Sequence, residues 1–151
     1  MNTVRILLVE DSEFVAGAVQ GMFAALAKDA IVEIVETLGC AFEKLGDDAF
    51  DAIILDLALP DSAADQTLSR VRQRVGVTPI IVLTGGSPPE VDRSEANDWI
   101  EKGTQTPLPE VVERVMRLAL TGKKAAEKAG KELDGLGHAI DSLRSSLVIN
   151  L

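Results

Sequence analysis

The sequence predicts an α/β fold, in which a parallel β-sheet carries helices on both faces. Two observations lead to this prediction. Short apolar runs at residues 4–9, 52–55 and 79–83 are typical of strands that are buried on both faces. Between these runs lie stretches whose apolar residues recur at helical spacing. Because strand and helix alternate along the chain, consecutive strands are expected to lie parallel, with the helices packed against the sheet.

The expected elements follow one another in a regular order. Strands are expected at residues 4–9, 31–35, 52–55 and 79–83, with a weaker fifth strand at 99–100. Helices are expected from Ser12 to residue 23, at 38–45 and at 64–75, and a last helix begins after Pro107. Ser12 can cap the first helix, because its hydroxyl can accept a hydrogen bond from an N–H group of the first turn.

The stretch between the fourth and fifth strands departs from this regularity. Residues 86–97 are polar and include Pro88 and Pro89, and their only apolar residues are Val91 and Ala96. An amphipathic helix needs a continuous apolar stripe to pack against the sheet. The fourth helix is therefore predicted to be short or irregular.

The chain length and charge limit the classes of function. The 151 residues suffice for one domain of ordinary size and a short appendage. The formal net charge is −9, and residues 1–120 hold 10 Lys and Arg against 20 Asp and Glu. An acidic surface repels nucleic-acid phosphates and anionic lipid, so binding to nucleic acid or to a membrane surface is not expected.

The apolar and cysteine content indicate a cytoplasmic location. No apolar run is long enough to span a bilayer, and the N-terminal residues lack the apolar stretch of a signal peptide. Cys40 is the only cysteine, so no internal disulfide is expected, which fits a reducing compartment. We expect Cys40 to serve in packing.

Polar residues follow the predicted strands at their carboxyl ends. They are Glu10, Asp11, Asp56, Thr84 and Lys102. In open parallel sheets, ligands bind outside the carboxyl ends of the strands, where the strand order reverses. These five side chains are therefore expected to lie in one cleft.

This set of residues suits phosphoryl transfer. Three carboxylates in one cleft repel one another, and a Mg²⁺ ion held by Glu10, Asp11 and Asp56 would remove that conflict. One carboxylate can act as the nucleophile and form an aspartyl phosphate. Lys102 would supply positive charge and Thr84 a hydroxyl to the phosphoryl oxygens. Further donors can come from the backbone N–H groups near Ala58 and Gly85.

At this point the sequence resembles a known family, the response-regulator receiver domains of bacterial two-component signalling. The resemblance covers about residues 4–121. It depends on four motifs that each end a predicted strand: ILLVEDS at 6–12, DAIILDLALPD at 51–61, PIIVLTG at 79–85 and DWIEK at 98–102. Each motif is weak alone, but four in the right order are a specific signal.

The resemblance implies a fold and a set of roles. The fold is the flavodoxin-like, doubly wound, five-stranded parallel sheet of order 2-1-3-4-5. Asp56 would be the phosphoacceptor, and Mg²⁺ would be held by Glu10, Asp11, Asp56 and the backbone carbonyl of Ala58. The donor would be a histidine kinase or a histidine phosphotransfer protein, and the output would be contact with a downstream protein.

The resemblance also implies a switch. Lys102 would bind the phosphate, Thr84 would be the switch hydroxyl, and Trp99 occupies the position of the switch aromatic residue. In that mechanism Thr84 moves toward the phosphate and Trp99 rotates into the space that it leaves. Simple packing is an equally good reading of a lone tryptophan.

Two features depart from the family pattern. Thr84 and Lys102 are only 18 positions apart, shorter than usual by about one helical turn, or roughly four residues. Lys102 is followed by Gly103, where many receivers have a proline whose peptide bond is commonly cis. Chemistry at Asp56 is little affected, but the usual output surface is placed in doubt.

The C-terminal residues form a distinct segment. We divide the chain into a receiver domain at 1–121 and a helical extension at 122–151, too short for a DNA-binding domain. Alternate spacings of four and three produce a heptad seam, which consists of Leu108, Val112, Val115, Ala119, Gly122, Ala126, Ala129, Leu133, Leu136, Ile140, Leu143 and Leu147.

Three structures for this extension remain open. The seam favours a coiled coil that continues the last receiver helix and forms a homodimer or binds a partner. Four glycines, each costing about 1 kcal/mol in a helix interior, favour a break near Gly122 or at 135–137. The extension could then fold back on its own domain or be disordered. His138, the only histidine, is expected to face solvent or to pack.

The leading function is a stand-alone receiver whose phosphorylation switches protein–protein contacts. The alternative is a structural module, in which the extension organises a dimer or complex and phosphorylation has little effect on output. A turnover enzyme is not expected: an aspartyl phosphatase usually carries a second acid two residues after the nucleophile, and that position is Ala58.

Overall fold

Five parallel strands form a single sheet of order β2-β1-β3-β4-β5, which confirms the predicted topology. The computed structural model describes residues 3–86, 89–103 and 106–149, and side chains as far as residue 143. The strands are β1 Val4–Val9, β2 Ala30–Val35, β3 Ala52–Leu55, β4 Ile80–Thr84 and β5 Asp98–Glu101. The helices are α1 Glu13–Leu26, α2 Leu38–Asp47, α3 Ala64–Val75 and α4 Leu108–Ile149.

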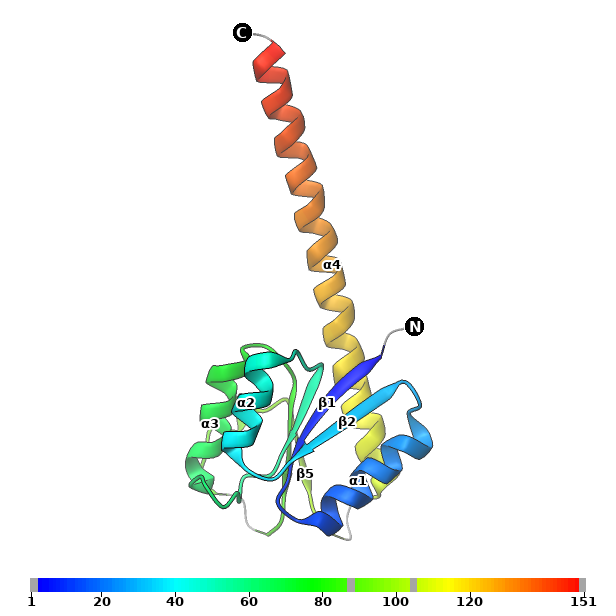
Figure 1. Cartoon of the computed structure of the whole chain (residues 1–151), viewed down its shortest axis with the longest axis vertical. Coiled ribbons are helices and arrows are strands. Elements are labelled where there is room, and N and C mark those ends of the chain that lie inside the picture. The colour runs from blue at the N-terminus through cyan, green and yellow to red at the C-terminus, as the bar shows by residue number, and fades with distance from the viewer. Residues whose placement is uncertain (1–2, 87–88, 104–105, 150–151) are drawn as a thin grey trace.

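The helices cover both faces of the sheet, with α2 and α3 on one face and α1 and the first part of α4 on the other (Figure 1). The alternation of side chains along a strand explains the two cores. Ile6 and Leu8 of β1 pack toward α1 and α4, whereas Leu7 and Val9 pack toward α2 and α3. All four are fully buried, which is why residues 6–9 of β1 form an uninterrupted apolar run.

Local signals place the starts of α1 and α2. Ser12 caps α1 as predicted, because its Oγ accepts a hydrogen bond from Val15 N at 3.3 Å. Thr37 caps α2 in the same way through Cys40 N at 3.1 Å. The expected packing role of Cys40 is wrong: its side chain is exposed, because the apolar stripe of α2 passes through Leu38 and Ala41 instead.

The segment between β4 and β5 contains no α-helix within residues 89–97, as the sequence predicts. It holds one turn of 3-10 helix, η1 Arg93–Glu95. Pro88 lies outside the described residues, whereas Pro89 lies within them. The guanidinium of Arg72, on α3, holds this segment in place. Arg72 donates to Glu95 O at 2.7 Å and to Asn97 Oδ1 at 2.8 Å.

After β5 the chain turns at Gly103, which has φ +114°, a conformation that side-chain-bearing residues rarely adopt. No peptide bond among the described residues is cis, including the bond from Lys102 to Gly103. The glycine therefore makes the turn where many receivers use a proline.

Helix α4 runs without interruption from Leu108 to Ile149, and it extends from the domain as a rod (Figure 1). The predicted helix is confirmed, but the break near Gly122 or 135–137 is wrong. Fold-back is also wrong for residues 124–143, whose side chains are exposed. Gly122 faces Pro79, since an added Cβ would lie 3.7 Å from Pro79 Cγ, so the helix is still supported there. The division of the chain at 121/122 falls inside this one helix and stays a prediction.

A partly buried ion pair ties the base of α4 to the edge of the sheet. Arg114 donates from Nε to Asp98 Oδ2 at 2.7 Å and also from Nη2 to Asp98 Oδ1. Burial opposes ionisation of Asp98, but the hydrogen bonds from Arg114 and from Trp99 N outweigh it. The pKa of the Asp98 carboxyl is therefore held below its usual value.

Removal of this ion pair is expected to make the free energy of unfolding vary less with pH in the acid range. Because the folded pKa of Asp98 is lowered, its stabilisation is present above the unfolded pKa, about 3.9, and is lost as the pH falls through the folded pKa. Arg114→Gln is expected to cost about 1–2 kcal/mol of unfolding free energy at pH 7 and less at pH 3. Urea unfolding measures both values. Lys124→Gln, an exposed position of the same helix, is the control, and an equal cost of Arg114→Gln at both pH values would contradict the assignment.

Candidate functional site

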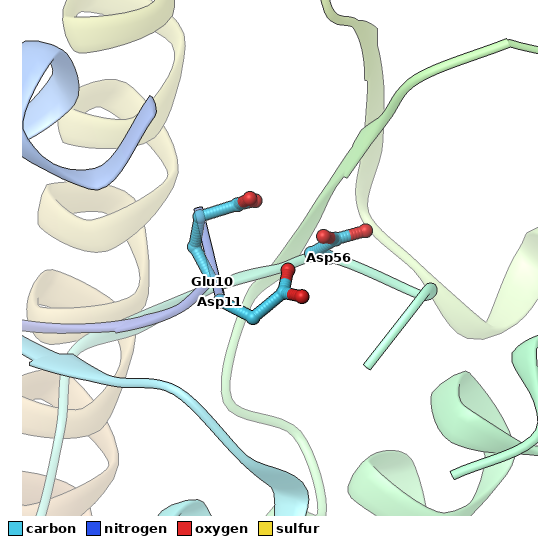
Figure 2. Close-up of side chains that lie close together, drawn as sticks. All are labelled: Glu10, Asp11 and Asp56. Carbon is cyan, nitrogen blue, oxygen red and sulfur yellow. The ribbon is translucent and has the colours of Figure 1, made fainter. Parts of the chain in front are cut away.

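Three carboxylates come together where β1 and β3 end. Glu10 and Asp11 follow β1, and Asp56 follows β3, with Asp56 N bonded to Val9 O at 2.9 Å. Each residue has a carboxylate oxygen within 4.8 Å of those of the other two, and Figure 2 shows the three side chains side by side. Glu10 and Asp56 are 1% and 4% exposed, whereas Asp11 is open to solvent. The cluster therefore has two buried acids and one exposed acid.

Lys102 supplies the opposing charge. It follows β5, and its Nζ lies 2.7 Å from Glu10 Oε2 and 3.1 Å from Asp56 Oδ2. Burial works against the lysine charge, but hydrogen bonds to Glu10 and Asp56 outweigh it and raise the pKa of Lys102. Burial is also the main reason that the pKa of Glu10 is raised. Lys102 thus stays charged between two buried acids.

Backbone groups orient the two buried carboxylates. Asp56 Oδ1 accepts a hydrogen bond from Ala58 N at 3.0 Å, and Glu10 Oε1 accepts one from Ser12 N at 3.2 Å. Gly85 lies beside the lysine stem, since an added Cβ there would be 3.5 Å from Lys102 Cδ. The aspartate is therefore held by a donor on each of its two oxygens.

Thr84 and Trp99 lie on the neighbouring strands β4 and β5 and line one hollow of about 260 Å³. The indole of Trp99 rests against η1. Its Nε1 donates to Arg93 O at 3.0 Å, and the Arg93 guanidinium carbon lies 4.3 Å from the ring centroid. Trp99 is thus partly buried and borders this hollow together with Thr84.

The donor set fits a hard divalent cation. The available ligands are all oxygens, which Mg²⁺ prefers. Glu10 Oε2 is buried and makes no hydrogen bond of good geometry, despite its close ionic contact with Lys102. The ammonium of Lys102 offsets its charge only in part, because the same ammonium is shared with Asp56, and a metal ion could supply a further positive partner to the three acids.

Two residues that shape the site were not among those the sequence predicted. Asp61 accepts from Leu38 N and Gly39 N, both at 2.9 Å, and thereby ties the loop after β3 to the start of α2. Thr67 is fully buried, and its hydroxyl lies 3.1 Å from Leu57 O, next to Asp56. Asp61 lies within the second motif, which was the only available signal for it.

Residues 6–113 match the response regulator receiver domain model, so the chain belongs to that family. Receiver domains of response regulators act as phosphoacceptors in two-component signalling, and they are signalling modules rather than turnover enzymes.

None of the described helices is both long and apolar enough to cross a membrane.

Individual relatives are response regulators. The chain is 27% identical over 142 residues to the transcriptional regulatory protein CutR of Streptomyces coelicolor, covering 87% of this chain but 62% of CutR. It is 32% identical over 82 residues to the cell cycle response regulator CtrA of Brucella abortus, covering 54% of this chain and 34% of CtrA. The signal receiver domain of a LuxO repressor protein from Vibrio parahaemolyticus has the same fold, with a TM-score of 0.70 and 24% identity over 82% of this chain and 95% of that one.

Proposed function

We propose that Asp56 accepts a phosphoryl group from a histidine kinase or a histidine phosphotransfer protein, and that the modification switches contacts with a downstream protein. One observation carries this proposal. Asp56, only 4% exposed, lies between Ala58 N–H and the ammonium of Lys102, beside the two further acids Glu10 and Asp11. A purely structural aspartate would not need two more carboxylates at its side.

The chemistry is an in-line displacement. A carboxylate oxygen of Asp56 attacks the phosphorus of a phosphohistidine, a P–O bond forms, the P–N bond breaks, and the imidazole leaves with the electron pair. Lys102 places its charge against the phosphoryl oxygens. Thr84 and the backbone N–H groups of Ala58 and Gly85 are the other donors in the proposal.

Mg²⁺ would be held by the carboxylates of Glu10, Asp11 and Asp56 and by the backbone carbonyl of Ala58. When bound, it supplies positive charge that offsets the acids and the incoming phosphoryl group. Asp11, as the solvent-exposed acid, is the residue through which water-coordinated metal would enter.

An apolar hollow beside Lys102 is our candidate docking surface for the phosphodonor. It has a volume of about 230 Å³ and is lined mainly by Phe14, Val15, Ala18, Leu83 and Leu108. Phe14, at the start of α1, is 86% exposed and lines this hollow, so its ring is available for contact with a partner. A helix of the donor that packs here would bring its phosphohistidine near Asp56.

Labelling tests the phosphoacceptor. Acetyl phosphate with Mg²⁺ is expected to add one phosphoryl group to the wild-type chain, and intact-mass measurement detects it. Asp56→Asn is expected to abolish the addition, because an amide is not a nucleophile of this kind. Asp65→Asn makes the same change at an exposed position of α3 and should be labelled normally. Unchanged labelling of Asp56→Asn would refute the proposal.

Trp99 reports the proposed switch, because it is the only tryptophan in the chain. Beryllofluoride with Mg²⁺ mimics the phosphate and is expected to shift tryptophan emission to shorter wavelength, as the ring leaves Arg93 and enters the hollow beside Thr84. Thr84→Val should remove the shift, and Thr121→Val, on the surface of α4, should keep it. An identical shift in Thr84→Val would contradict this role for Thr84.

The second candidate function is a structural module that forms a homodimer or larger complex through α4. This alternative depends on the uninterrupted rod of α4, whereas the family match supports the phosphoacceptor role. It predicts that labelling at Asp56 changes neither oligomeric state nor partner affinity. Mass measurement of the full-length chain with and without beryllofluoride distinguishes the two functions.

We also propose that the protein is located in the cytoplasm. Cys40 is exposed and unpaired, and a free surface thiol is best kept in a reducing compartment. The three acids of the site outnumber its one lysine, so no nucleic-acid or membrane ligand is proposed for it.

A further inference from the structure

Helix α4 presents an apolar stripe to solvent beyond the domain. The stripe is the heptad seam from Ala126 to Leu143, and four of its large residues are exposed: Leu133 by 68%, Leu136 by 61%, Ile140 by 49% and Leu143 by 65%. Leu147 lies beyond the described side chains. An isolated helix with three glycines after residue 129 is marginal in water. A covering partner would both bury the stripe and stabilise the helix.

The sizes of the seam residues are graded along the helix. The small residues Ala126 and Ala129 come first, Leu133 and Leu136 occupy the centre, and the large residues Ile140 and Leu143 come last. A parallel pair would place each residue against its own copy, so that alanine would face alanine at one end and leucine would face leucine at the other. Packed interiors tolerate such voids poorly.

We propose that α4 pairs in antiparallel orientation with α4 of a second copy of this chain. In that alignment each outer layer combines one small and one large residue. Ala126 meets Leu143 of the second copy, Ala129 meets Ile140 of the second copy, and Leu133 meets Leu136 of the second copy. The side-chain volume then varies less from layer to layer, and the distance between the two helix axes stays nearly constant along the pair.

Two of the glycines support this alignment. Gly130 and Gly137 each follow a seam residue by one position, and an added Cβ at either would meet nothing within 4 Å in the single chain. In the antiparallel pair, Gly130 of one copy lies within one helical turn of Gly137 of the other, beside the central leucines. The absence of side chains there allows close approach of the two backbones, which gives the helix-destabilising glycines a function.

The position of the domain also favours the antiparallel pair. Along the same seam, Val112, Val115 and Ala119 are buried against the sheet, and Gly122 faces Pro79. The domain therefore lies on the seam side of α4. A parallel partner would bring its own domain into that space, whereas an antiparallel partner has its domain at the opposite end of the rod.

This inference specifies the homodimer named among the proposed functions and concerns α4 alone, so it does not depend on phosphoryl transfer at Asp56. Disulfide trapping tests the orientation in a Cys40→Ser background, with Ala126→Cys and Leu143→Cys in separate full-length chains. In the antiparallel pair, identical positions are separated by 17 residues, or about 26 Å. Each variant alone should give no linked dimer on mild oxidation, and their mixture should give a disulfide-linked dimer that contains one chain of each variant.

Self-linked dimers of each variant alone, with no mixed product, would establish a parallel pair and overturn the proposal. A wild-type chain that sediments as a monomer at about 100 μM, a concentration at which even a weak dimer interface should be occupied, would also overturn it. Loss of labelling at Asp56 alone leaves these readouts unchanged, so failure of the phosphoacceptor proposal is separately visible.

Exchanging the sizes of the residues at positions 129 and 140 tests whether these two positions share a layer. Ala129→Leu places two large residues in one layer and is expected to weaken dimerisation at least tenfold in sedimentation equilibrium. Ile140→Ala leaves a void and should also weaken it, and the double variant Ala129→Leu/Ile140→Ala should restore it. His138→Leu adds a leucine to the exposed face opposite the seam and should have little effect. Tighter dimerisation of Ala129→Leu alone would indicate parallel pairing and refute the proposed alignment.

Discussion

Lys102→Met is expected to reduce phosphoryl uptake at Asp56 by at least a hundredfold, on the scale of other losses of preorganised charge, and to lower the unfolding free energy by about 2–4 kcal/mol. Methionine keeps much of the length of the side chain but removes its charge. The buried carboxylates of Glu10 and Asp56 then lose the ammonium that lies 2.7 and 3.1 Å away. Removal of one partner of a buried pair costs more than removal of both, and partial exposure of Lys102 moderates the cost here.

The matched control is Lys123→Met. Lys123 lies on α4 and pairs with Asp51 at 3.4 Å, with a side-chain exposure of 25% against 22% for Lys102. Its replacement should cost less than about 1 kcal/mol, the usual worth of a pair near the surface. Mg²⁺ should stabilise Lys102→Met more than the wild type, because the ion can replace the missing charge. Equal costs for the two variants in urea unfolding would show that Lys102 contributes no special electrostatic support.

Arg72→Met is expected to lower the unfolding free energy by about 2–3 kcal/mol and to loosen the segment before β5. The Arg72 guanidinium donates to three backbone carbonyls, those of Glu95, Gly76 and Thr78, at 2.7–2.8 Å, and to the side chain of Asn97. Asn97 Oδ1 in turn accepts from Ile80 N at 2.9 Å. One side chain thus joins the end of α3, the start of β4 and the residues after η1.

Tryptophan emission separates this effect from a general loss of stability. Trp99 is hydrogen-bonded to Arg93 O in η1, so loosening of the segment should shift its emission to longer wavelength under conditions where the protein remains folded. Arg74→Met, an exposed arginine on the same helix, is the control. A folded Arg72→Met protein with native emission would show that other contacts suffice to hold η1.

The parts of the structure that sequence predicts well are those decided by local pattern. Fully buried strands appear as apolar runs, and the polar residue that ends each run marks the edge where a ligand can bind. Asp56 and Lys102 were placed in this way, although 46 positions separate them. The lack of a regular fourth helix followed from the polar composition of residues 86–97, since no apolar stripe was available to anchor it.

The parts that sequence does not reveal depend on contacts between distant segments. Arg72 stands on an amphipathic helix, where an arginine usually indicates a solvated face, and nothing nearby in sequence shows that it binds the residues before β5. The continuity of α4 was left open for the same reason, because the heptad seam predicted one long helix and the glycines favoured a break. Helix propensity counts Gly122 as unfavourable, but its contact with Pro79 is a tertiary interaction that propensity does not include.

The continuity of α4 has a mechanical consequence. Its first turns are clamped in the core by Val111, Val115 and Ala119, and the same helix continues to the far end of the molecule. Residues 119–143 extend for about 36 Å at 1.5 Å per residue, so a tilt of about 5° at the base displaces the end by about 3 Å. A small tilt of the buried turns of α4 would therefore be amplified at the far end of the helix, and the Asp98–Arg114 contact beside Trp99 lies next to those turns.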